Sequence, residues 1–401
     1  MPSAAIPISL PLVISSALDL ALRIGIIAHL KYPIREPFAG GLEMYTHFLA
    51  RSLRMRGHSV TVFASTQSDD RLGVEAICDA TALDACGRAE ADDEAFFREH
   101  HAYLTLMNEL RHRRFDVVHD NSLHYLPVTM ADALPMPMVS TLHTPPFAWL
   151  ESGVRLSRQR NVTFVPISQS VARSWSPITP VSGVISNGID LERFAYRPQP
   201  CRARYWIWYG RIVPEKGLHL AMDAARLAGV RLKFAGPISD RTYYDREIAP
   251  RMHDGLTYLG HLDHDGLARE IGGASAYLCT PCWEEPFGLV VAEALACGVP
   301  VASFARGAIP EIIDADCGVL ARAGDVADLA RAGLAAEALS RKACRRRAEA
   351  RCDASAMIDG YERLYQQLAS PRRSLSRRAR PSAAASFSPA PTAPIAEVAA
   401  P

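Results

Sequence analysis

The chain has 401 residues and a formal net charge of +1, and 49% of its residues are hydrophobic while 22% are charged. This length accommodates two domains of ordinary size, and this composition is typical of a globular protein. The near-neutral charge gives no general attraction to nucleic acid or to an anionic membrane, so a site for a charged ligand must be built locally. The sequence contains no run of about 18 apolar residues, so we expect neither a membrane-spanning helix nor stable insertion into a membrane.

Residues 1–20 resemble the apolar part of a signal peptide, but no basic residue precedes Arg23. We therefore expect a flexible N-terminal extension. The nine cysteines are an odd number without a disulfide-framework spacing, which favours reduced thiols and a cytoplasmic location. Cys279 and Cys282 have C-x-x-C spacing, but no second such pair completes a four-ligand zinc site, so we interpret them as structural.

Short apolar segments alternate with longer helical segments along the whole chain. The expected strands are 22–28, 59–64, 116–119, 138–142, 163–167, 184–186, 205–209, 231–235, 256–259, 276–279, 299–303 and 318–320. A segment rich in Pro and Arg, residues 193–205, separates the two sets and is predicted to be a linker. This alternation predicts two doubly wound α/β domains that face each other across a cleft. Ligands in such folds bind beyond the carboxyl ends of the strands.

Two glycines and a short cationic loop are candidate phosphate-binding elements. Gly40 and Gly41 precede a predicted helix, whose N-terminus could approach a phosphate closely. Arg211 and Lys216 lie on one loop between a strand and a helix. The loop lacks the G-K-[ST] of a P-loop, and the chain lacks a G-x-G-x-x-G fingerprint here, which argues against an ATPase and a dehydrogenase.

Residues 284–298, EEPFGLVVAEALACG, contain two carboxylates separated by seven residues, Glu285 and Glu293. The segment from Leu289 to Cys297 is apolar except at Glu293, which predicts a buried helix with one carboxylate facing a polar cleft. A structural ion pair of Glu293 is the alternative. The backbone N–H groups of Phe287, Gly288 and Leu289 are expected at the start of that helix, where they could bind an anionic, hydroxyl-rich ligand.

The spacing E-P-F-G-L-V-V-A-E resembles the E-x7-E signature of the retaining nucleotide-sugar glycosyltransferases of family 4, which have the GT-B fold. Other stretches match that family in the expected order, from about Leu22 to Leu368. They are RIGIIAH, GGLEMYTHFLARSLRMRGHSVTVFAS, FDVVHDNS, STLHTPP, FVPISQS, VISNGIDLERF and WYGRIVPEKGLHLAMDAA.

The resemblance implies an acceptor-side Rossmann-like domain over 21–194 and a nucleotide-sugar-binding one over 195–352. It also implies that a last helix, 353–370, crosses back onto the first domain. Residues 371–401 are rich in Pro, Ser and Ala and cannot sustain a core, so we expect a disordered tail.

In this family pattern, Arg211 and Lys216 would neutralise the charge that develops on the departing β-phosphate. Glu293 would accept hydrogen bonds from the ribose hydroxyls, and Glu285 would lie near the transferred sugar. His143, which ends a strand, would contact the sugar or support proton transfer. The resemblance implies retention of anomeric configuration, by same-face attack in which the leaving phosphate takes the acceptor's proton.

The acceptor is expected near a polar cluster in the first domain, on grounds of location alone. The cluster consists of His119, Asp120, Asn121 and His124. No metal or other cofactor is expected, because the two D-x-D triplets, at 263–265 and 314–316, are interpreted as a helix cap and a turn.

The leading hypothesis is hexose transfer from UDP-glucose, with GDP-mannose next, to a hydroxyl acceptor. The alternatives are a GT-B isomerase of the UDP-sugar 2-epimerase kind and a non-catalytic protein that binds nucleotide sugars. The sequence leaves the acceptor and the oligomeric state open.

Overall fold

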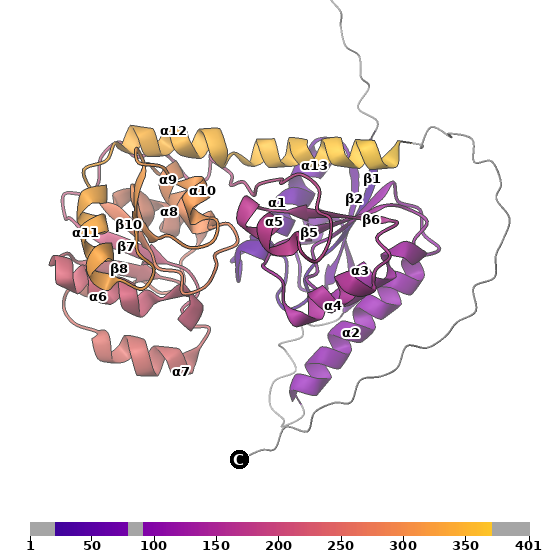
Figure 1. Ribbon diagram of the computed structural model, residues 1–401, viewed down its shortest axis with the longest axis horizontal. Helices are drawn as coiled ribbons and strands as arrows, with labels where there is room; N and C mark the ends of the chain where they lie inside the picture. The colour runs from indigo at the N-terminus through magenta and orange to yellow at the C-terminus, as the bar shows by residue number, and fades with distance from the viewer. Residues whose placement is uncertain (1–20, 79–90, 371–401) are drawn as a thin grey trace, which may run out of the picture. The chain divides into compact units, whose positions relative to one another are not determined.

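The computed structural model describes residues 21–78 and 91–370. The expectations for residues 1–20 and 371–401 lie outside this part of the chain. The described part contains two six-stranded sheets, and all strand pairs in both are parallel. This architecture confirms the predicted α/β fold with two doubly wound units (Figure 1).

The first sheet has the order β3-β2-β1-β4-β5-β6. Its strands are β1 (Arg23–Ile27), β2 (Ser59–Ser65), β3 (Val74–Cys78), β4 (Val117–Asp120), β5 (Met138–Leu142) and β6 (Val162–Pro166). The helices of this part are α1 (Gly41–Met55), α2 (Ala91–Leu110), α3 (Tyr125–Met130), α4 (Ala148–Leu156) and α5 (Gln169–Trp175). Each strand from β1 onward except β2 is followed by a helix, so the helix N-termini gather at the carboxyl edge of the sheet.

The sequence prediction was wrong at one edge of this sheet. The expected strand 184–186 has no regular structure, and only one backbone hydrogen bond, from Ile185 N to Pro166 O at 3.2 Å, ties it to β6. The sixth strand is instead β3, which is only half-buried at the opposite edge and therefore lacks a strong apolar pattern.

The second sheet has the order β12-β11-β10-β7-β8-β9. Its strands are β7 (Trp206–Tyr209), β8 (Leu232–Ala235), β9 (Leu256–Tyr258), β10 (Ala276–Cys279), β11 (Val301–Phe304) and β12 (Gly318–Ala321). The helices are α6 (Leu218–Ala228), α7 (Arg241–Tyr243), α8 (His264–Gly273), α9 (Leu289–Ala296), α10 (Ile309–Ile312), α11 (Val326–Ala336) and α12 (Arg341–Arg351).

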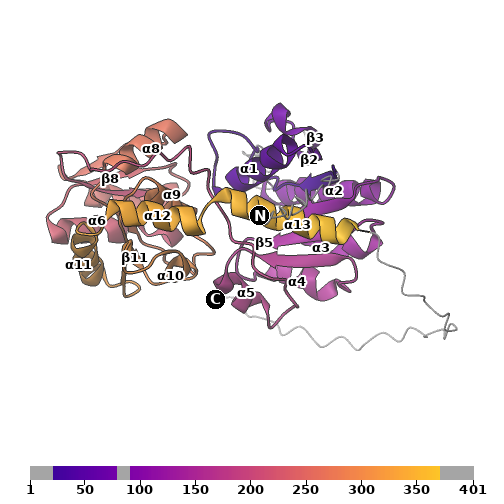
Figure 2. The same cartoon turned by 90° about the horizontal axis from the view of Figure 1, so that it is seen from above.

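The last helix, α13 (Ala354–Ala369), returns to the first sheet, as expected. Met357, Ile358, Tyr361 and Tyr365 are buried in one apolar core with side chains of β1, β2, β4, β5 and β6. Figures 1 and 2 both show α13 beside α1, while α12 lies beside α9 of the second sheet. In the part of the chain that the structure describes, no helix is both long and apolar enough to cross a bilayer.

Candidate functional site

A cavity of about 1020 Å³ lies at the carboxyl ends of the strands of both sheets. One wall comes from loops of the first sheet, and includes residues between 29 and 44 together with 123, 143, 144, 167 and 187. The other wall comes from the second sheet, and includes 209–211, 216, 235–237, 261–264, 267, 283 and 285–290, with 293. A cleft of this size at this edge is the expected location of a ligand site in a doubly wound fold.

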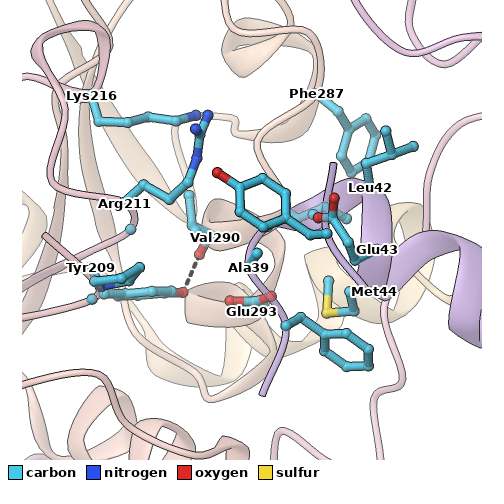
Figure 3. Close-up of a pocket in the computed structure, with 18 of the residues that line it drawn as sticks. Ala39, Leu42, Glu43, Met44, Tyr209, Arg211, Lys216, Phe287, Val290 and Glu293 are labelled. Carbon is cyan, nitrogen blue, oxygen red and sulfur yellow. Dashed lines mark hydrogen bonds between the residues drawn. The ribbon is translucent and has the colours of Figure 1, made fainter. Parts of the chain in front are cut away.

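The loop after β7 brings two cations to the cavity. Arg211 and Lys216 both line it, and Figure 3 shows their side chains extending toward the same part of the space. Gly217 lets this loop pack against the end of β10, because it has φ 66° and a Cβ there would lie 2.2 Å from the carbonyl oxygen of Thr280. The Arg211 guanidinium is 3.7 Å from Glu215, and about a third of its side chain is exposed to solvent.

Glu285 is held in place by two donors. Lys216 Nζ lies 2.7 Å from Glu285 Oε2, and the indole Nε1 of Trp283 donates to the same oxygen at 3.0 Å. Glu285 is only 8% exposed, yet it lines the cavity. These two contacts fix one carboxylate oxygen at the edge of the space.

Glu293 is buried within α9 at 5% exposure and also lines the cavity. Burial raises the pKa of this carboxyl to about 7, and the neighbouring Tyr209 hydroxyl only partly offsets the effect. No basic side chain of the described residues contributes to this shift, which disagrees with the structural ion pair considered above. The Tyr209 hydroxyl donates its hydrogen to the carbonyl oxygen of Val290 (Figure 3).

Two helix N-termini without side-chain caps face the cavity. The N-cap of α1 is Gly40 and that of α9 is Gly288, and neither end has a side-chain hydrogen bond to its first N–H groups. Gly288 has φ 98°, which favours glycine, and a Cβ there would meet Ile309 at 2.6 Å. Such ends carry partial positive charge and free N–H donors, so they attract anions and hydroxyl oxygens. Phe287 and Leu289 line the cavity beside Gly288.

His143 lines the cavity from the end of β5, although it is only 7% exposed. Its Nε2 lies 2.9 Å from Asn121 Oδ1, and its ring packs edge-on against Tyr45 with 4.7 Å between the centroids. Burial lowers the pKa of His143 to about 3, so the imidazole is neutral at physiological pH.

The expected acceptor cluster requires correction, because none of its four residues lines the cavity. His119, Asp120 and Asn121 are almost fully buried. His119 contacts Thr141 Oγ1 at 2.6 Å and the hydroxyl of Tyr365, while Asp120 accepts hydrogen bonds from Ser122 and Ser140. They belong to β4, a central strand that is buried along its whole length, so their polar groups form hydrogen bonds within the protein interior. Asn121 instead positions His143.

His29, Lys31 and Glu43 also line the cavity, and the sequence reasoning missed them. His29 Nδ1 lies 3.4 Å from Glu43 Oε1. The sequence did contain a signal, because His29 lies two residues after the end of β1 and Glu43 lies in the first turn of α1, after the glycine pair. Both positions follow from the rule that ligands bind beyond strand ends.

The D-x-D triplets have the local roles expected of a cap and a turn. Asp263 accepts from Gly266 N at 2.8 Å at the start of α8. Asp314 accepts from Asp316 N at 3.1 Å and lies 3.2 Å from Arg347. Over residues 21–78 and 91–370, no group of three or more His, Cys, Asp or Glu residues is arranged to hold a metal ion.

Comparison with known proteins gives two family matches that together cover most of the chain. Residues 39–193 match the family model described as Glycosyltransferase Family 4, and residues 198–351 match the one described as Glycosyl transferases group 1. The chain is similar to glycogen synthase of Mycobacterium tuberculosis, with 28% identity over 73% of this chain and 81% of the relative. It is also similar to phosphatidyl-myo-inositol mannosyltransferase of the same organism, with 27% identity over 78% of this chain and 86% of the relative.

Among solved structures, the HepE protein of Anabaena in complex with UDP-glucose superimposes with a TM-score of 0.68 at 17% identity. The match covers 86% of this chain and 100% of that one. This likeness shows a shared fold.

Proposed function

Because the chain belongs to the family 4-like glycosyltransferases of the GT-B fold, we propose that it transfers a hexose from a nucleotide-diphosphate sugar to a hydroxyl acceptor with retention of anomeric configuration. UDP-glucose is the favoured donor and GDP-mannose the next. The observation that carries this proposal is that two cations of one loop and two uncapped helix N-termini face one cavity.

The diphosphate is the group that these cations and helix ends suit best. Arg211 offers a planar fork of donors for phosphate oxygens, and Lys216 offers a mobile point charge. The N-terminus of α1 adds N–H groups from the first sheet, where Gly40 and Gly41 let the backbone approach closely. Negative charge that grows on the leaving phosphate would therefore meet fixed positive charge, which lowers the barrier to bond cleavage.

The two carboxylates would serve the two sugars of the donor. Glu293, on α9, would accept hydrogen bonds from the ribose hydroxyls once it is ionised. Glu285 would lie near the transferred hexose, whose hydroxyls could also accept hydrogen bonds from the N–H groups of Phe287, Gly288 and Leu289. Lys216 and Trp283 already engage Glu285, which supports an orienting and electrostatic role more than that of a free nucleophile.

That restraint on Glu285 supports same-face attack as the route to retention. In this scheme the leaving phosphate accepts the proton of the acceptor hydroxyl, so no side chain needs to act as a general base. Neutral His143 would donate or accept a hydrogen bond at a sugar hydroxyl. We propose that no metal or other cofactor takes part, because Arg211 and Lys216 supply the positive charge that a metal gives in other transferase folds.

Two of the comparisons bear on the identity of the donor sugar nucleotide. The structural neighbour solved with UDP-glucose supports that donor, whereas one relative is named a mannosyltransferase. A cytoplasmic location is part of the same proposal. The cysteines in the described residues form no disulfide, which is consistent with a reducing compartment.

A thermal-shift panel of UDP, GDP, ADP and their common sugar conjugates tests the donor site, with and without EDTA. A ligand that binds only the folded protein raises the melting temperature by mass action. We expect the largest shift with UDP or UDP-glucose, unchanged by EDTA, and no shift in Arg211→Ala/Lys216→Ala. If no nucleotide shifts the wild-type protein at millimolar concentration, the proposed donor site is wrong.

Stereochemistry and metal use are tested on the reaction itself. Proton NMR of the first product formed should show the anomeric configuration of the donor, and the rate should survive EDTA. An inverted product would exclude retention. Loss of activity in EDTA with rescue by Mg²⁺ or Mn²⁺ would exclude the metal-free reaction.

A further inference from the structure

A group of aromatic rings lies at the N-terminal ends of α2, α3 and α4, beside the cavity. Phe96, Tyr125 and Trp149 stand within the first two turns of these helices, which follow β3, β4 and β5. The three helices pack side by side in the order α2, α3, α4 (Figure 1). Since each follows a strand of the first sheet, their N-terminal ends share the carboxyl edge that also lines the cavity.

The rings form one connected surface, which we name the aromatic shelf: Phe96, His100, Tyr125 and Trp149. The centroid of Phe96 is 5.3 Å from that of Trp149, and Trp149 is stacked on Tyr125 at 5.8 Å. The Tyr125 hydroxyl is 2.9 Å from His100 Nδ1. Trp149 is 58% exposed and Phe96 is 43% exposed, although Phe, Tyr and Trp bury large areas when they have a partner. These rings are held in place by one another and still present open faces.

Short segments of chain connect the shelf to residues that line the cavity. Leu123 lines the cavity two residues before Tyr125, and its φ of 57° is strained for a residue of this size. Thr144 lines the cavity five residues before Trp149. On α2, burial raises the pKa of Glu99, and the cavity-lining side chains of His29 and Lys31 partly offset this effect.

Two buried polar atoms without partners among the described residues belong to His124, whose ring stacks on Tyr125, and to Thr144, which lines the cavity. His124 is 8% exposed, and its Nδ1 accepts a hydrogen bond from Leu126 N, which makes Nε2 the N–H donor of the neutral ring. That Nε2 has no partner in the described part of the chain, and the same is true of Thr144 Oγ1. Buried polar atoms usually have partners, so these two positions suit a ligand rich in hydroxyl groups.

We propose that the aromatic shelf binds the saccharide part of the acceptor, whose reactive hydroxyl then reaches the cavity past Thr144. This inference rests on the proposed function and names the class of its acceptor as an oligosaccharide or a glycoconjugate. Rigid aromatic faces offer large contact area to the C–H faces of sugar rings at little entropic cost, and the imidazoles between them suit hydroxyls. A surface for acyl chains would instead present branched aliphatic side chains in continuity.

Saturation-transfer NMR with maltotetraose, cellotetraose, mannotetraose and chitotetraose tests the shelf directly. We expect saturable binding of at least one probe at millimolar concentration. Trp149→Ala should weaken it by roughly tenfold, as does truncation of a central aromatic contact in other interfaces. Trp149→Tyr should restore most of it, because it keeps a stacking face. Trp149 is largely exposed, so both variants should keep the wild-type melting temperature.

Phe97→Ala is the matched control. Phe97 is the next residue on α2 and 63% exposed, but it stacks on His101 and contacts none of the shelf rings. The Phe97→Ala variant should bind the saccharide probes as tightly as the wild type does. The nucleotide thermal shift of the wild type is measured in parallel, so that failure of the donor site is distinguished from failure of the shelf.

Four results would overturn the proposal. The first is that no probe binds the wild type, and the second is that Trp149→Ala and Phe97→Ala weaken binding equally. The third is that vesicles of phosphatidylcholine and phosphatidylglycerol bind the wild type and lose binding with Trp149→Ala, which would mark a lipid surface. The fourth is a dimer in light scattering that Trp149→Ala dissociates, which would mark an interface between two copies.

Discussion

Lys216 and Glu285 form an ion pair on one wall of the cavity, with 2.7 Å between Nζ and Oε2. The cation proposed for the diphosphate is therefore paired with the carboxylate proposed for the hexose. A donor that binds Lys216 through its phosphate and Glu285 through its hexose would contact both members of this ion pair. The positions of the phosphate and of the transferred sugar are therefore coupled through one contact.

Glu285→Gln should lower kcat by about a hundredfold or more, the effect of removing one preorganised electrostatic group from other active sites. Gln keeps an oxygen that can accept from Lys216 and Trp283, so the melting temperature should change little. Lys216 would no longer be neutralised, and UDP should bind at least as tightly as before. Steady-state kinetics and titration calorimetry measure the two effects.

The neighbouring residue provides the control for this substitution. Glu284 leaves 62% of its side chain exposed and accepts from Gly307 N at 2.7 Å, away from the cavity lining. Glu284→Gln should keep wild-type kcat. Full activity in Glu285→Gln would show that the assigned role of Glu285 is wrong.

Glu293 should make the stability of the free protein depend on pH. Its folded pKa of about 7 lies above the ordinary value of 4.5. The folded protein therefore binds more protons than the unfolded chain between these values, and this contribution to stability is lost as the pH rises from 4.5 through 7. Glu293→Gln removes the effect. The fall in unfolding free energy between pH 5 and pH 8 should be smaller in the variant by on the order of 1–3 kcal/mol, measured by urea titration.

The same carboxyl should link proton release to donor binding. Ribose hydroxyls donate to the ionised form, so binding should shift Glu293 toward ionisation and release a proton near pH 7. Calorimetry in two buffers of different ionisation enthalpy detects this proton. Affinity for UDP should fall as the pH drops from 7 toward 5 in the wild type and not in Glu293→Gln. Equal pH dependence in both proteins would contradict the role of Glu293.

The sequence predicted those parts of the site that depend on short segments. Arg211 and Lys216 share one loop, and the seven residues between Glu285 and Glu293 place the first at a helix entrance and the second on the helix. The predicted carboxyl ends of the strands also indicated the edge of the sheet at which the cavity lies. All ten residues proposed for the catalytic and donor-binding roles line the cavity: Gly40, Gly41, His143, Arg211, Lys216, Glu285, Phe287, Gly288, Leu289 and Glu293.

The parts that failed depend on contacts distant in sequence. His119 stands at the end of β4 much as His143 stands at the end of β5, but its ring turns inward against Tyr361 and Tyr365 of α13. A strand end alone does not determine which face a side chain occupies when the covering helix arrives 240 residues later. The aromatic shelf was missed for the same reason, because its rings come from three separate helices.

Glu311 joins α10 of the second sheet to the first residues of α5 in the first. Its two carboxylate oxygens accept from Gln169 N at 2.9 Å and Ser170 N at 2.7 Å. Glu311→Ala should remove both charge-assisted hydrogen bonds, lower the unfolding free energy by about 1–3 kcal/mol and speed hydrogen exchange at these two amides. Mass spectrometry or NMR detects the exchange.

An exposed ion pair on α12 provides the comparison for Glu311. Glu349 lies 2.7 Å from Arg345 one helical turn away, and half of its side chain is in solvent. Glu349→Ala should cost no more than about 0.5 kcal/mol. If both variants behave alike, the contact between Glu311 and α5 contributes no more than a surface pair.

His143 should act as a neutral imidazole throughout the working pH range. Burial holds its pKa at about 3, well below the ordinary 6.5, so it does not change charge between pH 5 and pH 9. His143→Gln should lower kcat/KM by about tenfold, as expected for one lost hydrogen bond to the sugar, and should leave the shape of the pH profile unchanged. Asn121→Ala should have a smaller effect in the same direction, because it only releases the ring that Asn121 Oδ1 holds at 2.9 Å. An acid limb near pH 6 that disappears in His143→Gln would instead identify His143 as a titrating acid–base group.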